Sequence, residues 1–204
     1  MQIAVIGWGS LIWHPGCLRT KSRWYSDGPR LPIEFARISS DKRLTLVIHL
    51  GSAAQRTYWA VSEFKTLSGV RKNLGKREGT TNLDYVHALT VGGRSEGWKG
   101  VVDATVSERI REWLKGRQEI QGAVWTGLAT NWLEKRGKEF TPEDALQYLD
   151  DVERAKDNAT SAYNRTREYI TNTPPRIQTV VRKMVRKRKG WKDAVLAGIL
   201  FEVE

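Results

Sequence analysis

The sequence has 204 residues, of which 40% are hydrophobic and 28% are charged, and its formal net charge is +11 at pH 7. This composition is typical of an ordinary globular chain and excludes a disordered or membrane-embedded class. No repeat or low-complexity block divides the sequence, so we expect a single domain over residues 1–204.

The apolar run at the N-terminus is too short to span a bilayer, and it lacks the basic region and cleavage site of a signal peptide. We therefore expect a cytoplasmic protein that makes no membrane contact. The single cysteine, Cys17, excludes an internal disulfide. Because His14, His49 and His87 do not follow the spacing of metal ligands, we expect no metal site.

The first predicted element is a buried strand at residues 3–6, followed by a turn that contains Gly7, Gly9 and Ser10. Such a turn presents backbone N–H groups that can bind an anion or a carbonyl oxygen. A dinucleotide-binding fingerprint is disfavoured because Ile12 replaces its third glycine and no helix follows. Ser10 also lacks the G-x-S-x-G frame of a hydrolase nucleophile.

Two strands are predicted at residues 31–39 and 43–50, joined by a polar turn. Arg37 lies in line with the apolar face of the first strand, by the two-residue period of side chains along a strand. Its guanidinium could bind a substrate carboxylate, or it could form a structural ion pair with Glu34 or Asp41.

A further strand is predicted at residues 57–63, and the spacing of apolar residues then predicts a short helix that starts at Leu67. We expect this helix to end within residues 75–79, which places Glu78 just past its C-terminus. The partial negative charge of the last carbonyls, together with partial burial, would raise the pKa of the Glu78 carboxyl. A carboxyl group of this kind can take and return protons near neutrality.

The alternative for Glu78 is an exposed carboxylate that Lys76 and Arg77 screen. Both interpretations are compatible with the sequence.

The second half of the chain predicts both strands and helices. We expect a helix at residues 106–113 with Ser107 as a possible N-cap, and a helix that starts at Pro142 after a capping Thr141 and continues to about residue 170. The remaining predictions are strands at residues 85–91, 121–128 and 194–203, and an exposed loop at residues 92–97.

Much of the positive charge lies within residues 182–192. Val181, Met184 and Val185 are spaced to form the apolar face of a helix, which favours a solvated basic face on its other side. Binding of nucleic acid or another polyanion is the alternative. The basic residues are Arg182, Lys183, Arg186, Lys187, Arg188, Lys189 and Lys192.

Two stretches together resemble the γ-glutamylcyclotransferase-like superfamily, including its ChaC-type branch. The first is the turn Trp8-Gly9-Ser10-Leu11 after the opening strand, where family members usually have tyrosine in place of Trp8. The second is the order of strand, short helix, glutamate and glycine over residues 57–79. The resemblance covers about the first 90 residues of the sequence.

The resemblance implies an α+β fold, a mixed β-barrel flanked by helices. The helical and basic elaboration expected at about residues 141–192 departs from the family, because it goes beyond the smallest members. It also implies an enzyme without a cofactor, in which the α-amino group of a γ-glutamyl compound attacks its own γ-carbonyl and releases 5-oxoproline and an amine. Glu78 would be the catalytic proton carrier. The substrate-binding residues would be Trp8, Gly9, Ser10 and Leu11, with Arg37 as a further candidate. A module on the same fold that binds a small ligand or nucleic acid without catalysis is the alternative.

Overall fold

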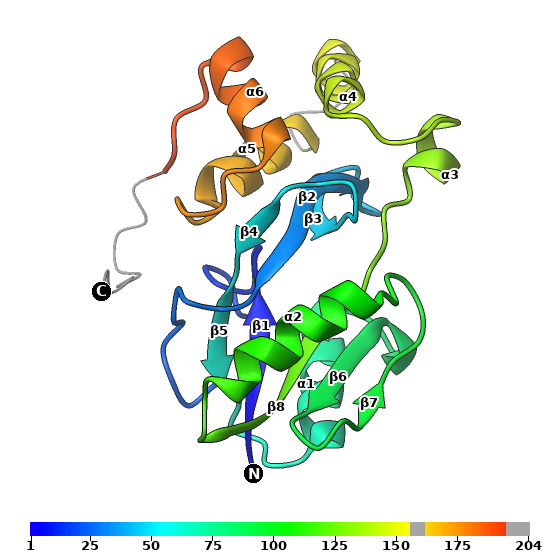
Figure 1. Ribbon diagram of the computed structural model, residues 1–204. Coiled ribbons are helices and arrows are strands. Elements are labelled where there is room, and N and C mark those ends of the chain that lie inside the picture. Colours follow the sequence, from blue (N-terminus) through cyan, green and yellow to red (C-terminus); the bar gives the residue numbers. More distant parts are fainter. Residues whose placement is uncertain (156–161, 195–204) are drawn as a thin grey trace. The chain divides into compact units, whose positions relative to one another are not determined.

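The computed structural model describes residues 1–155 and 162–194 (Figure 1). The protein is α+β, and the chain divides into two compact units. The first unit comprises residues 1–31 and 56–128, and the second comprises residues 32–55 and the described residues from 129 onward. The single domain expected from the sequence stays a prediction, since one domain can contain two compact units.

The first unit is built on a mixed five-stranded sheet in the order β5-β1-β8-β6-β7. The central strand β1 runs parallel to β8 and antiparallel to β5, and β6 runs antiparallel to β8 and β7. The strands are β1 (Gln2–Gly7), β5 (Tyr58–Val61), β6 (Val86–Thr90), β7 (Ser95–Glu96) and β8 (Ile120–Thr126). Four of these strands were predicted, whereas β7 lies in the stretch expected to be a loop.

The described strands form no closed barrel, so this part of the expected fold is wrong. Barrel closure would require the outer edges of β5 and β7 to pair with each other. The edge of β5 is already occupied, because Lys21 N donates to Val61 O at 2.9 Å and Tyr25 and Trp59 exchange two backbone hydrogen bonds. The other edge strand, β7, has only two residues.

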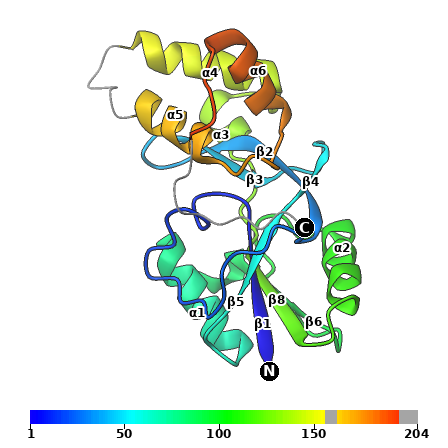
Figure 2. The same ribbon diagram turned by 90° about the vertical axis from the view of Figure 1, so that its left-hand side faces the viewer.

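Two helices cover opposite faces of this sheet, α1 (Leu67–Glu78) on one side and α2 (Ala104–Lys115) on the other (Figures 1 and 2). Helix α1 buries Leu67, Val70 and Leu74 against Ile3 and Val5 of β1. The apolar spacing that predicted this helix therefore marks its buried face.

The N-terminus of α2 differs from the sequence expectation. Asp103 is the N-cap, and its carboxylate accepts a hydrogen bond from Val106 N at 2.9 Å. Ser107 lies inside the helix, because the helix starts two residues earlier than its apolar pattern indicates. A short 3₁₀ helix, η1 (Leu83–Tyr85), precedes β6.

The second unit contains most of a three-stranded sheet in the order β3-β2-β4, and its helices pack around this sheet and each other. The strands are β2 (Arg30–Ile38), β3 (Leu44–Ile48) and β4 (Ala54–Arg56). The helices are α3 (Trp132–Arg136), α4 (Pro142–Arg154), α5 (Ala162–Asn172) and α6 (Val180–Lys189).

The predicted strand pair and the helix start at Thr141 are confirmed, since the Thr141 side chain accepts from Asp144 N at 3.1 Å. Helix α3 was not predicted, because five residues are too few to show a helical period. The predicted strand at residues 194–203 lies almost wholly outside the described residues. No helix within residues 1–155 and 162–194 has both the length and the apolar composition needed to cross a membrane.

Among the described residues of the second unit, two charged side chains are buried. Glu34 is 1% exposed and accepts hydrogen bonds from Phe35 N and from Val180 N, at the start of α6, both at 2.8 Å. Burial raises the pKa of the Glu34 carboxyl, against the opposing effect of these hydrogen bonds. Arg182 is 0% exposed and donates to the carbonyl oxygens of Pro174 and Ile177, both at 2.7 Å.

Candidate functional site

The turn after β1 carries backbone donors for which the described residues provide no acceptor. Ile12 N donates to Gly9 O at 3.1 Å and His14 N donates to Ser10 O at 2.8 Å, which closes the turn. Within the described part of the chain, the N–H groups of Gly9, Ser10 and Leu11 have no acceptor. Gly9 and Leu11 are buried residues, and buried N–H groups without an acceptor are uncommon in proteins. Three adjacent backbone donors at this turn are therefore without an acceptor among the described residues.

The other residue of the predicted turn site, Trp8, is buried with Leu11 in the core of the first unit. A tyrosine hydroxyl can both donate and accept a hydrogen bond, whereas the indole ring of Trp8 can only donate one.

Glu78 is the last residue of α1, and Gly79 ends the helix in a left-handed conformation with φ 69°. The expectation that Glu78 lies just past the helix is therefore wrong by one residue, because a glycine is the residue that most readily adopts this C-terminal conformation. The Glu78 carboxylate accepts from Arg77 Nη1 at 2.9 Å. The side chains of Arg77 and Glu78 are 13% and 19% exposed, so the alternative of an exposed glutamate is also wrong.

Arg77 brings Glu78 and the turn together. Its Nη2 atom donates to Ser10 Oγ at 2.9 Å and to His14 O at 2.8 Å, while Nη1 holds Glu78. From the sequence alone, Arg77 was expected only as a charge that screens Glu78. The contact with Ser10 joins residues 67 positions apart, which no local pattern reveals.

Asn73 supplies a second link between α1 and the segment after the turn. Its Oδ1 accepts from Arg19 N at 2.8 Å, and its Nδ2 donates to Cys17 O at 2.9 Å. Asn73 faces the core side of α1 and is buried. Asn73 was not predicted, although a polar residue on the buried face of a predicted helix is a signal in the sequence that could have identified it.

Arg37 lies in β2 of the second unit, and its Nη1 donates to Ala129 O at 2.7 Å. The two acidic residues considered as its partners have other contacts: Glu34 accepts from backbone N–H groups, and Asp41 pairs with Arg165 at 3.3 Å. A role for Arg37 in substrate binding stays a prediction.

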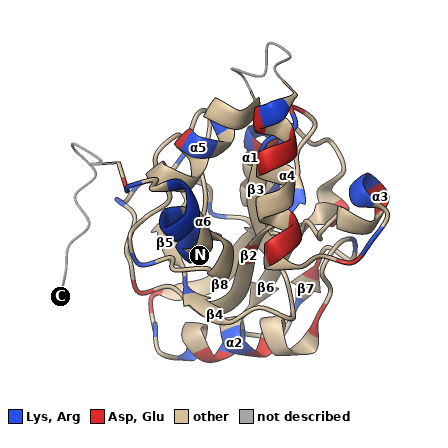
Figure 3. Cartoon of the chain, turned by 90° about the horizontal axis from the view of Figure 1, so that it is seen from above, with Lys and Arg blue, Asp and Glu red and all other residues tan. Residues whose placement is uncertain are grey.

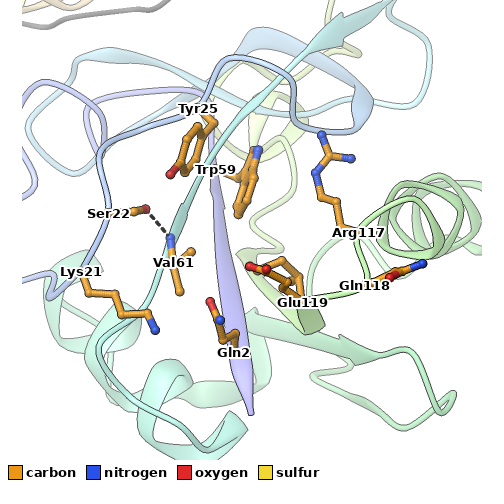
Figure 4. A pocket seen from close by; sticks show the side chains of 10 residues that line it. Gln2, Lys21, Ser22, Tyr25, Trp59, Val61, Arg117, Gln118 and Glu119 are labelled. Carbon is orange, nitrogen blue, oxygen red and sulfur yellow. Dashed lines mark hydrogen bonds between the residues drawn. The ribbon is translucent and has the colours of Figure 1, made fainter.

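A separate pocket of about 420 Å³ lies in the first unit and is shown in Figure 4. The pocket residues Trp59 and Val61 pair with Ile6 and Ala4 of β1. Side chains alternate between the two faces of a strand, and Ile3 and Val5 pack against α1. The pocket therefore lies on the face of the sheet opposite α1. The pocket is therefore distinct from the turn and Glu78.

Protein groups already cover the aromatic rings of this pocket. Tyr25 and Trp59 stack with their ring centroids 4.6 Å apart. The Arg117 guanidinium lies 5.4 Å from the Trp59 centroid and 4.4 Å from that of Trp113. Because the ring faces are occupied, a flat ligand has no free surface on which to stack, and we place the candidate site at the turn instead.

The described residues contain no group of three or more His, Cys, Asp or Glu side chains that could hold a metal ion. The candidate site offers one carboxylate, one guanidinium, one hydroxyl and three backbone N–H groups. These groups can bind an oxyanion and transfer a proton.

Helix α6 is mostly basic (Figure 3), and acidic residues pair with four of the seven basic residues in the stretch 182–192. Arg186 pairs with Asp193, and Lys189 lies 2.8 Å from both Asp150 and Glu153 of α4. The predicted apolar face is present, since Val181 and Val185 are buried. The exposed cations on this stretch without an ion-pair partner among the described residues are Lys183, Lys187 and Lys192. Binding of a polyanion stays a prediction.

No protein-family model, curated protein or solved structure matches this chain. The geometry of the site and the resemblance of its two motifs are therefore the basis of the functional proposal.

Proposed function

We propose that this protein is a γ-glutamylcyclotransferase-like enzyme that converts a γ-glutamyl compound into 5-oxoproline and a free amine without a cofactor. The observation that carries the proposal is the pairing of three unused N–H donors at Gly9, Ser10 and Leu11 with the Glu78 carboxylate, joined through Arg77. We also propose that the protein belongs to the γ-glutamylcyclotransferase-like superfamily, although its five-stranded sheet does not close into the expected barrel.

In this reaction the substrate nitrogen forms a C–N bond to the γ-carbonyl carbon, and the original C–N bond to the leaving amine breaks. The carbonyl oxygen becomes an oxyanion during the attack, and the N–H groups of the turn would stabilise it. The α-ammonium loses two protons as it becomes the lactam N–H, and the leaving nitrogen gains two. Glu78 would carry these protons, a role worth about 10²–10⁴-fold in rate.

The enzyme would also have to hold the substrate in its folded conformer, in which the amine lies beside its own carbonyl. Holding reacting groups within one molecule at contact distance removes much of the entropy cost of the attack. Groups outside the turn would determine which leaving amine is accepted. Glutathione, other γ-glutamyl peptides and γ-glutamylamines are candidate substrates.

The test is the variant Glu78→Gln, which keeps the size of the side chain but cannot accept a proton. We expect loss of 5-oxoproline release by about 10²-fold or more, measured by mass spectrometry with a set of small γ-glutamyl compounds. Lys76→Gln is the matched control, because Lys76 is an exposed neighbour on the same helix turn. Full activity of folded Glu78→Gln would overturn the proposal, as would the absence of 5-oxoproline with every compound.

A further inference from the structure

One guanidinium connects both parts of the proposed site. Arg77 makes hydrogen bonds to Glu78 Oε1, Ser10 Oγ and His14 O, with distances of 2.8 to 2.9 Å. Because a guanidinium is planar and rigid, these three acceptors are held in fixed directions around one group. The position of the Glu78 carboxylate is thereby fixed relative to the turn.

The burial of this pair strengthens the effect of the Arg77 charge. Arg77 and Glu78 are 13% and 19% exposed, so solvent screens their attraction less than it screens an exposed ion pair. A cation in direct contact opposes the rise in the pKa of Glu78 expected from the helix C-terminus and favours the ionised carboxylate, which is the form that takes a proton from the substrate ammonium. The other titratable groups close by in the sequence, Lys76 on α1 and His14 and Cys17 on the turn segment, are exposed residues.

We propose that Arg77 is the positioning residue of this site. It keeps the Glu78 carboxylate ionised and holds it beside the unused N–H groups of residues 9–11. The catalytic consequence rests on the proposed function, whereas the effects of Arg77 on Glu78 and on the turn do not.

The kinetic test compares Arg77→Met, which removes the charge, with Arg77→Lys, which keeps the charge and loses the planar fork. In Arg77→Met we expect kcat to fall by about 10–100-fold and the acid limb of the pH profile to move up by about one unit. In Arg77→Lys we expect a fall in kcat with little movement of that limb. Lys76→Met is the control for loss of a charge on the same helix turn, and it should change neither quantity.

A second measurement does not depend on activity. The side-chain carboxyl carbon of Glu78 is titrated by NMR in the wild type and in Arg77→Met, with Glu78→Gln used for assignment. We expect the pKa of Glu78 to rise by about one unit in Arg77→Met. Identical titrations in the two proteins would overturn the positioning role. If the pKa rises but no γ-glutamyl compound yields 5-oxoproline, the positioning role stands and the proposed function fails.

Discussion

At the scale of single residues, His87 shows how burial decides the protonation state of a side chain. Its ring is buried in β6, and its Nε2 lies 2.8 Å from Lys99 O. A Cβ atom on Gly127 would approach this nitrogen to 2.4 Å, so a glycine is required beside the ring. His87 is a structural residue of the first unit.

Burial lowers the pKa of His87 below its usual value of 6.5, and the same cause acts on His49. A lowered pKa means that the unfolded chain binds more protons, so the stabilising contribution is complete above pH 6.5 and is lost as the pH falls through the folded-state value. We expect the free energy of unfolding to decrease as the pH falls below 6.5, and to decrease less steeply in His87→Gln. Urea unfolding at a series of pH values measures this slope. The exposed His14→Gln is the control, and an unchanged slope in His87→Gln would contradict the assignment.

The residues of the candidate site divide into those that sequence could predict and those that it could not. The glycine turn and Glu78 were predictable because turn chemistry and helix ends are local features. Arg77 and Asn73 were missed in their linking roles, because each contacts a segment more than 50 positions away. Which partner a polar side chain reaches depends on how α1 packs against β1, and this packing is a tertiary property.

At the scale of elements, local patterns predicted most helices and strands but not all of their ends. Helix α1 follows its apolar spacing, whereas α2 begins ahead of its own pattern at a capping aspartate. Both Asp103 and Ser107 are good N-cap residue types, so the choice between them depends on backbone geometry. The two-residue β7 was missed because it forms only by pairing with β6.

The cap of α2 gives a direct prediction. Asp103→Ala removes the acceptor for Val106 N and should lower the free energy of unfolding by about 1 kcal/mol. Ser107→Ala is the matched variant inside the helix, where alanine has the higher helix propensity, and it should not be destabilising. Chemical denaturation of the two variants beside the wild type measures both effects. Equal destabilisation of the two would contradict Asp103 as the cap.

At the scale of the whole molecule, the net charge of +11 is a poor guide to how many cations are available to a partner. Arg182 is buried, and Arg188 and Lys189 are paired with acidic residues of α4. The sequence could show where the basic residues cluster. The sequence could not show which of these basic residues form ion pairs with the acidic residues of α4.

Releasing these cations should strengthen binding to a polyanion. The double variant Asp150→Asn, Glu153→Gln frees Arg188 and Lys189, and it removes two negative charges from a protein whose net charge is +11. We expect it to elute from heparin at higher salt than the wild type, because more cations can displace bound counterions. The control is Glu119→Gln, Glu168→Gln, which changes the net charge equally at two exposed glutamates that have no ion-pair partner among the described residues. Equal elution of the two variants would show that only net charge matters.

The occupied edge of β5 also bears on how the protein behaves at high concentration. An unpaired strand edge can join the edge of a second molecule, and this is a common route to aggregation. Here the segment that contains Lys21 and Tyr25 uses the outer hydrogen-bonding groups of β5, and the opposite edge is the two-residue β7. The five-stranded sheet is thus protected against edge-to-edge association without closing into a barrel.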